Sequence, residues 1–399
     1  MKKTITLLVL AVLLTAITPA AAASATGGQA ALLMDYETGQ IIYNDKIDEA
    51  LPPASITKLM TMHLVFEAIS TGEISLSDEV TASANASNLP DGSSTIFLGT
   101  GEVLTVEELL NAVAIISAND AGIALAEHVA GSEGAFVQKM NEKAQELGLT
   151  QTVFTNSHGL HSPGHNMSAR DIAILSRATI QKYPEILTYS SNKFSRMERE
   201  TRYVREGYFD LHSTFASLIG WRNIDGLKTG WTPEAGRCIT VTAQEGDRRY
   251  IAVVLGAENI QQRDEKVKDL LAKGFEQFHP QTALSADEVV ETVEIANAKT
   301  QSVDIVPAQD VTLVMSRDMS LDTHFQQDTE INQDLEAPLK KGDVVGSLSF
   351  QRKDSGELVA EVDLVVERDV EKANFFTRSL RFLSGVFSDL GNWILGLFA

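Results

Sequence analysis

The chain has 399 residues, a net charge of −21 at pH 7, 44% hydrophobic residues and a single cysteine. This length and apolar content exceed what one hydrophobic core usually holds, so we expect two or more globular domains. The acidic charge argues against nucleic acid as a partner, because neutralising phosphates requires a basic surface. The lone Cys238 excludes an internal disulfide.

The first 23 residues have the layout of a secretory signal peptide. Lys2 and Lys3 precede an apolar run from Ile5 to Ile17, and Pro19 and several alanines follow. A basic start, a short apolar stretch and small residues at the end are typical of a cleavable signal. The run is short for a membrane span, although an uncleaved anchor is the alternative. We expect residues 1–23 to be removed and the mature protein to lie outside the cytoplasmic membrane.

The segment Ser55-Ile-Thr-Lys58 offers a nucleophile and a base. Pro52 and Pro53 cannot lie in a helix interior, whereas residues 56–68 carry apolar side chains at helical intervals. Ser55 is therefore expected in the first turn of a helix, where its N–H lacks an intrahelical partner and can face an oxyanion. Lys58 would lie on the same helix face and could take the hydroxyl proton.

Two more motifs follow in order, Ser117-Ala-Asn119 and Lys228-Thr229-Gly230. Each triplet is common by chance, but their joint occurrence after Ser55 favours a serine acyl-transfer site. Periodicity predicts strands at 30–35 and 250–255, and helices at 105–116, 122–129 and 168–177. Residues 24–281 are thus expected to form one α+β domain that carries all three motifs.

Other possible reactive groups receive simpler interpretations. Cys238 lies in an apolar stretch and is interpreted as a strand residue. His158, His161 and His165 could suggest a metal site, but the glycines and proline among them break the helix that a histidine pair would need. We expect no metal and no cofactor. Arg263 is a candidate for binding a carboxylate, but its two acidic neighbours at an expected helix start favour a solvated surface residue.

The last two segments have different textures. In residues 282–372 apolar side chains alternate, for example from Leu358 to Val366 after the turn at Asp354-Ser355-Gly356, which predicts a small β-sandwich. Residues 373–399 place apolar side chains on one face of a helix that is too polar to span a bilayer but suited to its interface. We expect this amphipathic helix to anchor the protein to the membrane surface, with packing on the protein or a partner as the alternative. The face comprises Phe376, Leu380, Leu383, Phe387, Leu390, Ile394 and Leu397, with Trp393 at the interface.

The three motifs resemble those of the penicillin-recognising serine acyltransferases. Further segments are similar to the low-molecular-mass penicillin-binding proteins that act as D-alanyl-D-alanine carboxypeptidases: residues 117–121, 125–127, 136–141 and 225–230, and Asn156 with His158-Gly159-Leu160. The resemblance covers most of residues 26–280. It implies a penicillin-binding/β-lactamase-like transpeptidase fold, in which an antiparallel sheet with helices adjoins an all-α lobe.

The resemblance also implies roles for individual residues. Ser55 would be the nucleophile and Lys58 its base, with Ser117 passing the proton to the departing amine. The substrate would be bound by Asn119, Lys228, Thr229, Gly230, Trp231 and Thr232. Backbone N–H groups of Ser55 and Trp231 would form the oxyanion hole, while Lys228 and the two threonines would bind a terminal carboxylate.

The expected activity is removal of the terminal D-alanine from peptidoglycan stem peptides through an acyl-enzyme on Ser55. β-Lactams should acylate the same serine, since their strained amide imitates the substrate. The location would be the periplasmic face of the cytoplasmic membrane. Three alternatives stay open: a β-lactamase, a DD-endopeptidase, and a catalytically inactive peptidoglycan-binding envelope protein. The presence of both a nucleophile and its base argues against the catalytically inactive protein.

Overall fold

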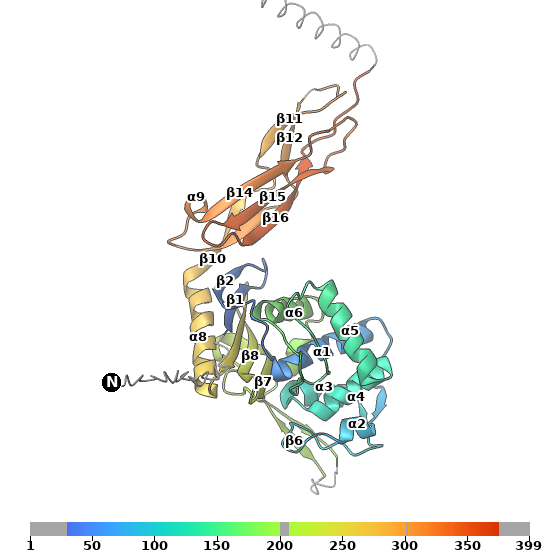
Figure 1. The fold of residues 1–399 in the computed structure, drawn as a ribbon. Coiled ribbons are helices and arrows are strands. Elements are labelled where there is room, and N and C mark those ends of the chain that lie inside the picture. Colours follow the sequence, from blue (N-terminus) through green and yellow to red (C-terminus); the bar gives the residue numbers. More distant parts are fainter. Residues whose placement is uncertain (1–29, 200–206, 301, 375–399) are drawn as a thin grey trace, which may run out of the picture.

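The computed structural model describes residues 30–199, 207–300 and 302–374 (Figure 1). Its centre is an antiparallel sheet with the strand order β2-β1-β9-β8-β7. The strands are β1 (Ala30–Asp35), β2 (Ile41–Asp45), β7 (Ile224–Thr232), β8 (Gly236–Glu245) and β9 (Arg248–Ala257). The predicted strand at 30–35 is confirmed, and the one at 250–255 is the middle of β9. The sheet places β7, which carries the third motif, at one edge.

Helices cover both faces of this sheet (Figure 1). One face packs against α8 (Ile260–Gln277), with a core that includes Tyr250, Leu271 and Phe275. The other face packs against a larger helical group, whose core is continuous with that of the sheet. Its members are α1 (Lys58–Ser70), α2 (Ala84–Ser87), α3 (Val106–Ile115), α4 (Asn119–Ala130), α5 (Glu133–Glu146), α6 (Ala169–Lys182) and α7 (Ile186–Ser190).

Side-chain caps fix where several of these helices begin. Thr105 accepts from the N–H of Glu108, whose carboxylate accepts from the N–H of Thr105, so α3 starts with a capping box. Ser168 caps α6 and Asn259 caps α8 in the same way, without the reciprocal bond. The three predicted helices at 105–116, 122–129 and 168–177 correspond to α3, α4 and α6.

Shorter elements complete this domain. The pair β3 (Glu79–Thr81) and β4 (Val103–Thr105) leads into α3, while β5 (Phe194–Met197) and β6 (Phe209–His212) form an antiparallel pair. Two 3-10 turns, η1 (Ala54–Thr57) and η2 (Trp221–Asn223), precede α1 and β7. In Figure 1 the β5–β6 pair projects from the end of the domain opposite the C-terminal strands.

The C-terminal region is all-β, as predicted, apart from the one-turn helix α9 (Leu321–His324). A five-stranded sheet in the order β11-β12-β16-β15-β14 faces the pair β10-β13 across a shared apolar core. These strands are β10 (Phe278–Leu284), β11 (Glu291–Glu294), β12 (Ser302–Pro307), β13 (Val311–Ser316), β14 (Phe325–Ile331), β15 (Val344–Arg352) and β16 (Leu358–Val366). The alternation in β16 buries Val362, Leu364 and Val366.

The two domains are joined by specific contacts. The Gln40 amide donates to the carbonyl of Val314 and accepts from its N–H, at 2.8 and 2.7 Å, and Arg170 pairs with Glu357 at 2.8 Å. Among the described residues, none of the helices has the length and apolar character to cross a membrane. The predicted signal peptide at 1–23 and the predicted amphipathic helix, from residue 375 onward, lie outside the described residues.

Candidate active site

Ser55 and Lys58 meet at the start of α1. Ser55 lies in the 3-10 turn η1, and Lys58 is the first residue of the α-helix that follows, so the predicted helix start is confirmed. The Lys58 amine lies 2.9 Å from Ser55 Oγ. It also lies 2.5 Å from Asn119 Oδ1 and 2.6 Å from the carbonyl oxygen of His158. The lysine side chain is fully buried, so these three oxygens fix its amine.

Two glycines allow the chain to pack tightly around Ser55. A Cβ on Gly230 would come within 2.7 Å of the Pro53 carbonyl and 3.0 Å of Ser55 N. A Cβ on Gly159, whose φ is +86°, would overlap the carbonyl of Ala54. Since real Cβ atoms are not found so close to backbone atoms, both positions require glycine. The third motif is therefore brought against the nucleophile by its glycine.

The second motif occupies the tight turn between α3 and α4. Ser117 has a φ of +65°, a strained value for a residue with a side chain. Its Oγ is buried and has no hydrogen-bond partner among the described residues. Asn119 opens α4, and its N–H donates to the carbonyl of Ser94 at 2.8 Å. A buried hydroxyl without a partner is uncommon and suits a group that awaits a ligand.

Strand β7 carries the remaining predicted residues. Lys228 is fully buried and its amine donates to the Thr229 carbonyl at 2.9 Å. The Thr229 hydroxyl contacts that of Thr214 at 2.6 Å, and Thr232 Oγ1 accepts from Ala235 N–H at 3.0 Å. Trp231 is 53% exposed, and the guanidinium of Arg237 lies 4.6 Å from its ring centroid.

Burial and neighbouring charge tune the two lysines. Burial, and then the charge of Lys228, hold the pKa of Lys58 well below its ordinary value, while Asp120 opposes this. Burial, and then the charge of Arg263, lower the pKa of Lys228 to about 7. The Asp120 carboxylate is itself buried and accepts from the N–H groups of Ile96 and Leu98 at 3.0 Å. A neutral Lys58 can accept the proton of Ser55, which is the requirement for a base.

The interpretation of Arg263 as a solvated surface residue is wrong. Its side chain is 3% exposed in α8, where it pairs with Asp264 at 2.7 Å, and its charge acts on Lys228. The acidic neighbours suggested a solvated helix start, whereas the packing of α8 on the sheet turns the guanidinium inward. Cys238, in contrast, is a buried residue of β8, as predicted. Burial raises the pKa of its thiol to about 11.

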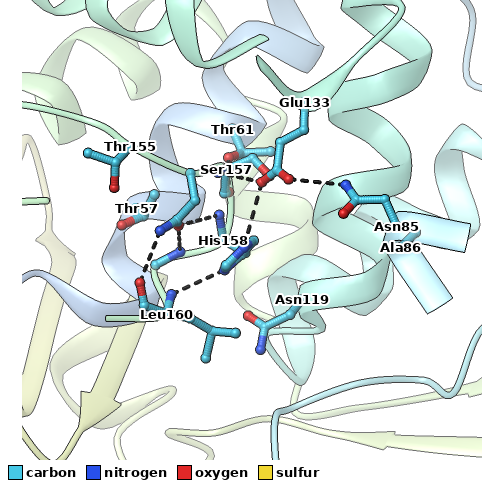
Figure 2. A network of polar contacts seen from close by, with 12 residues as sticks. Thr57, Thr61, Asn85, Ala86, Asn119, Glu133, Thr155, Ser157, His158 and Leu160 are labelled. Atoms are coloured by element: carbon cyan, nitrogen blue, oxygen red, sulfur yellow. Dashed lines mark hydrogen bonds and ion pairs between the residues drawn. The ribbon is translucent and has the colours of Figure 1, made fainter. Parts of the chain in front are cut away.

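Sequence reasoning missed a polar network next to Lys58 (Figure 2). The turn after residue 155 supplies the His158 carbonyl, and the carboxylate of Glu133 reaches Ser157 and His158 from α5. Nearby, His165 Nε2 lies 2.7 Å from Thr57 Oγ1. No sequence motif indicates that a backbone carbonyl will accept a hydrogen bond from a buried lysine. From the sequence alone, a glutamate at a helix start needs no explanation beyond the helix dipole.

Comparisons with known proteins identify the family. A family model described as D-alanyl-D-alanine carboxypeptidase matches residues 16–259, and one described as penicillin-binding protein 5, C-terminal domain, matches residues 278–372. The chain is 35% identical to the D-alanyl-D-alanine carboxypeptidase DacF of Bacillus subtilis, over 94% of this chain and 97% of the relative. It is also 35% identical to the carboxypeptidase DacC of Escherichia coli, over 93% and 91%.

A solved structure agrees with these relatives. The crystal structure of penicillin binding protein 5 from Haemophilus influenzae superposes with a TM-score of 0.72 at 31% identity, covering 86% of this chain and 97% of that one. The expected penicillin-binding fold with a C-terminal all-β domain is thereby confirmed. The chain belongs to the D-alanyl-D-alanine carboxypeptidase family of low-molecular-mass penicillin-binding proteins.

Proposed function

We propose that this chain is a serine-type carboxypeptidase that removes the terminal D-alanine from peptidoglycan stem peptides through an acyl-enzyme on Ser55. Its family membership supports the reaction, and one observation carries the choice of residues. The Lys58 amine lies 2.9 Å from Ser55 Oγ and is buried beside a second lysine, which favours its neutral form. A buried serine–lysine pair of this kind can generate an alkoxide at neutral pH.

The reaction begins with attack of Ser55 Oγ on the carbonyl carbon of the penultimate D-alanine, while Lys58 takes the hydroxyl proton. The N–H groups of Ser55 and Trp231 stabilise the oxyanion, and loss of one such donor typically lowers turnover about 100- to 1,000-fold. Ser117 delivers a proton to the departing amine of the terminal D-alanine. Water then releases the shortened peptide and restores Ser55.

The terminal carboxylate of the substrate is bound by β7. Lys228 supplies a cation, and Thr229 and Thr232 supply hydroxyl donors from the same strand. Arg263 adds positive charge from α8, since its field already acts on Lys228. Asn119, whose side chain already contacts Lys58, binds the substrate amide. Gly230 keeps this strand close enough to Ser55 for both interactions to reach one substrate.

We further propose that the protein is exported and held at the periplasmic face of the cytoplasmic membrane. The signal-like sequence of residues 1–23 and the amphipathic pattern of residues 373–399 support this location. β-Lactams act as covalent inhibitors in this proposal, because acylation of Ser55 by their strained amide uses the same base and oxyanion donors as the substrate.

The test is to incubate the purified protein with a labelled penicillin and locate the modified residue by mass spectrometry. D-Alanine release from a peptide ending in Lys-D-Ala-D-Ala is measured in parallel. We expect the label on Ser55, its loss in Ser55→Ala and in Lys58→Ala, and release of free D-alanine. A folded protein that gives neither label nor D-alanine would overturn the proposal and leave a binding role.

Penicillin labelling, D-alanine release and an added assay on crosslinked muropeptides together separate the enzymatic rivals. A β-lactamase would turn over the penicillin rapidly without accumulating labelled Ser55. A DD-endopeptidase would cleave crosslinked muropeptides in preference to the linear pentapeptide. The carboxypeptidase proposal expects a persistent label and preference for the linear peptide.

A further inference from the structure

The base Lys58 is oriented by two acceptors besides its serine. When neutral, its amine keeps two N–H donors and one lone pair. For the lone pair to face Ser55 Oγ, the two N–H groups must point at the other two oxygens within reach, Asn119 Oδ1 and the His158 carbonyl. The position of that carbonyl therefore decides whether the lone pair meets the serine hydroxyl.

The His158 carbonyl belongs to a tight polar turn. Asn156 Oδ1 accepts from the N–H groups of His158 and Gly159 at 3.2 and 2.6 Å, and its amide donates to the Leu160 carbonyl at 3.0 Å. Thr61, one helical turn after Lys58, donates to the Ser157 carbonyl at 2.6 Å. These bonds are local to the turn, or tie it to α1.

Glu133 ties the same turn to a different helix. Its Oε1 accepts from the N–H and hydroxyl of Ser157 at 3.0 and 2.8 Å and lies 3.6 Å from His158 Nε2 (Figure 2). His158 Nδ1 accepts from Leu160 N–H at 3.1 Å, so a neutral ring carries its proton on Nε2, which faces the carboxylate. Burial, and then the charge of Lys58, lower the pKa of His158 to about 4, which keeps the ring neutral.

The carboxylate is built to stay ionised. Burial alone would raise the pKa of Glu133, but its hydrogen bonds from Ser157 and Asn85 outweigh burial and lower it. Glu133 also opens α5, where the helix dipole favours an anion. A dipole role alone would not require the side chain to turn onto Ser157 and His158.

We propose that Glu133 is a positioning residue for the base: it fixes Ser157 and the His158 ring, and thereby holds the His158 carbonyl against the Lys58 amine. This inference rests on the proposed function, in which Lys58 activates Ser55. Without the carboxylate, Ser157 and His158 would lose their contacts with α5, and Asn141 of that helix would still hold Phe154, just before the turn. The Lys58 amine would then lose its fixed orientation, and water could enter the space around it.

The pH dependence of acylation separates this role from a structural one. The charged and titratable groups that face Lys58 are Lys228 on β7, Asp120 on α4, and His158 and His165 from the turn at residues 156–165. Of these groups only His158 contacts Glu133, and since the carboxylate raises the pKa of that ring, its removal leaves His158 neutral. A better hydrated Lys58 would regain part of its ordinary pKa, so the rise of the acylation rate would move to higher pH. Lost stability alone would lower the rate without moving this rise.

The experiment compares Glu133→Ala, Glu133→Gln and Glu127→Ala in the purified full chain. Glu127 on α4 is a matched control, since Asn85 donates to both carboxylates, whereas Glu127 makes no hydrogen bond or ion pair with the turn among the described residues. The second-order rate constant for labelling by penicillin is measured from pH 5 to 10, with the melting temperature of each variant. If Glu133→Ala does not fold, Ser157→Ala is measured in its place, because it removes one hydrogen bond to Glu133.

We expect Glu133→Ala to label about 10- to 100-fold more slowly at pH 7, and its pH profile to move upward by about one unit. Glu133→Gln keeps an acceptor oxygen for Ser157 and should stay within about fivefold of the unaltered chain, and Glu127→Ala within about twofold. An unshifted profile in Glu133→Ala, whatever its rate, would overturn the inference. Near-normal labelling of Lys58→Ala would instead overturn the base assignment itself.

Discussion

Replacing Lys228 with methionine should stabilise the fold while removing activity. The lysine is fully buried in β7, and burial together with Arg263 lowers its pKa from 10.5 to about 7. At pH 6 the native state must hold a buried ammonium, whereas the unfolded chain holds a hydrated one. Methionine has a similar length and no charge, so Lys228→Met removes this penalty.

The size of the effect follows from the two pKa values. A group with a pKa of about 7 in the folded state and 10.5 when unfolded destabilises the fold by about 5 kcal/mol below pH 7. The penalty declines as the pH rises toward 10.5, because the native lysine has by then lost its proton. Subtracting about 1 kcal/mol for the lost bond to the Thr229 carbonyl leaves a gain of about 4 kcal/mol at pH 6 and below about 1 kcal/mol at pH 9.5.

Urea unfolding of both proteins at pH 6 and pH 9.5 measures this difference. Removing Lys228 also relieves Lys58 of a neighbouring charge, which adds to the gain at pH 6. Lys139→Met, at an exposed position on α5, is the control and should give no pH-dependent gain. An equal gain in the free energy of unfolding at both pH values, or a loss of stability at pH 6, would refute the reasoning that burial of the Lys228 ammonium destabilises the fold.

Three further changes probe the site and the anchor. Gly230→Val should lower penicillin labelling at least 100-fold in a folded protein, because the Cβ of valine would meet the Pro53 carbonyl and Ser55 N. Labelling within tenfold of the unaltered chain would contradict the close approach of β7 to Ser55. Trp231→Ala should keep labelling within about tenfold, since the backbone N–H that serves the oxyanion remains and the indole is half exposed; a 100-fold loss would give the side chain a direct role. Deletion of residues 375–399 should move the mature protein from the membrane fraction to the soluble fraction, and continued sedimentation with membranes would contradict the anchor.

The sequence alone determined the order of the catalytic motifs along the chain and the position of several helices and strands. Ser55 and Lys58 are three residues apart on one helix, so their contact follows from helical geometry. The spacing of apolar residues located β1, α3, α4 and α6, because an element that buries one face carries apolar residues at regular intervals. The alternation in the C-terminal domain likewise predicted β16. Local patterns carry this information because each depends on neighbours within one element.

Only the tertiary structure decided what surrounds the base. Asn119 and the His158 carbonyl reach Lys58 from positions 61 and 100 residues away, and no repeat in the sequence brings them there. Arg263 follows the pattern of a surface residue, yet the packing of α8 buries it where its charge acts on Lys228. The orientation of the Lys58 amine and the charges that act on it depend on distances between elements. These distances are fixed only when the helices and the sheet pack together. The sequence therefore indicated the catalytic groups but not the network that positions them.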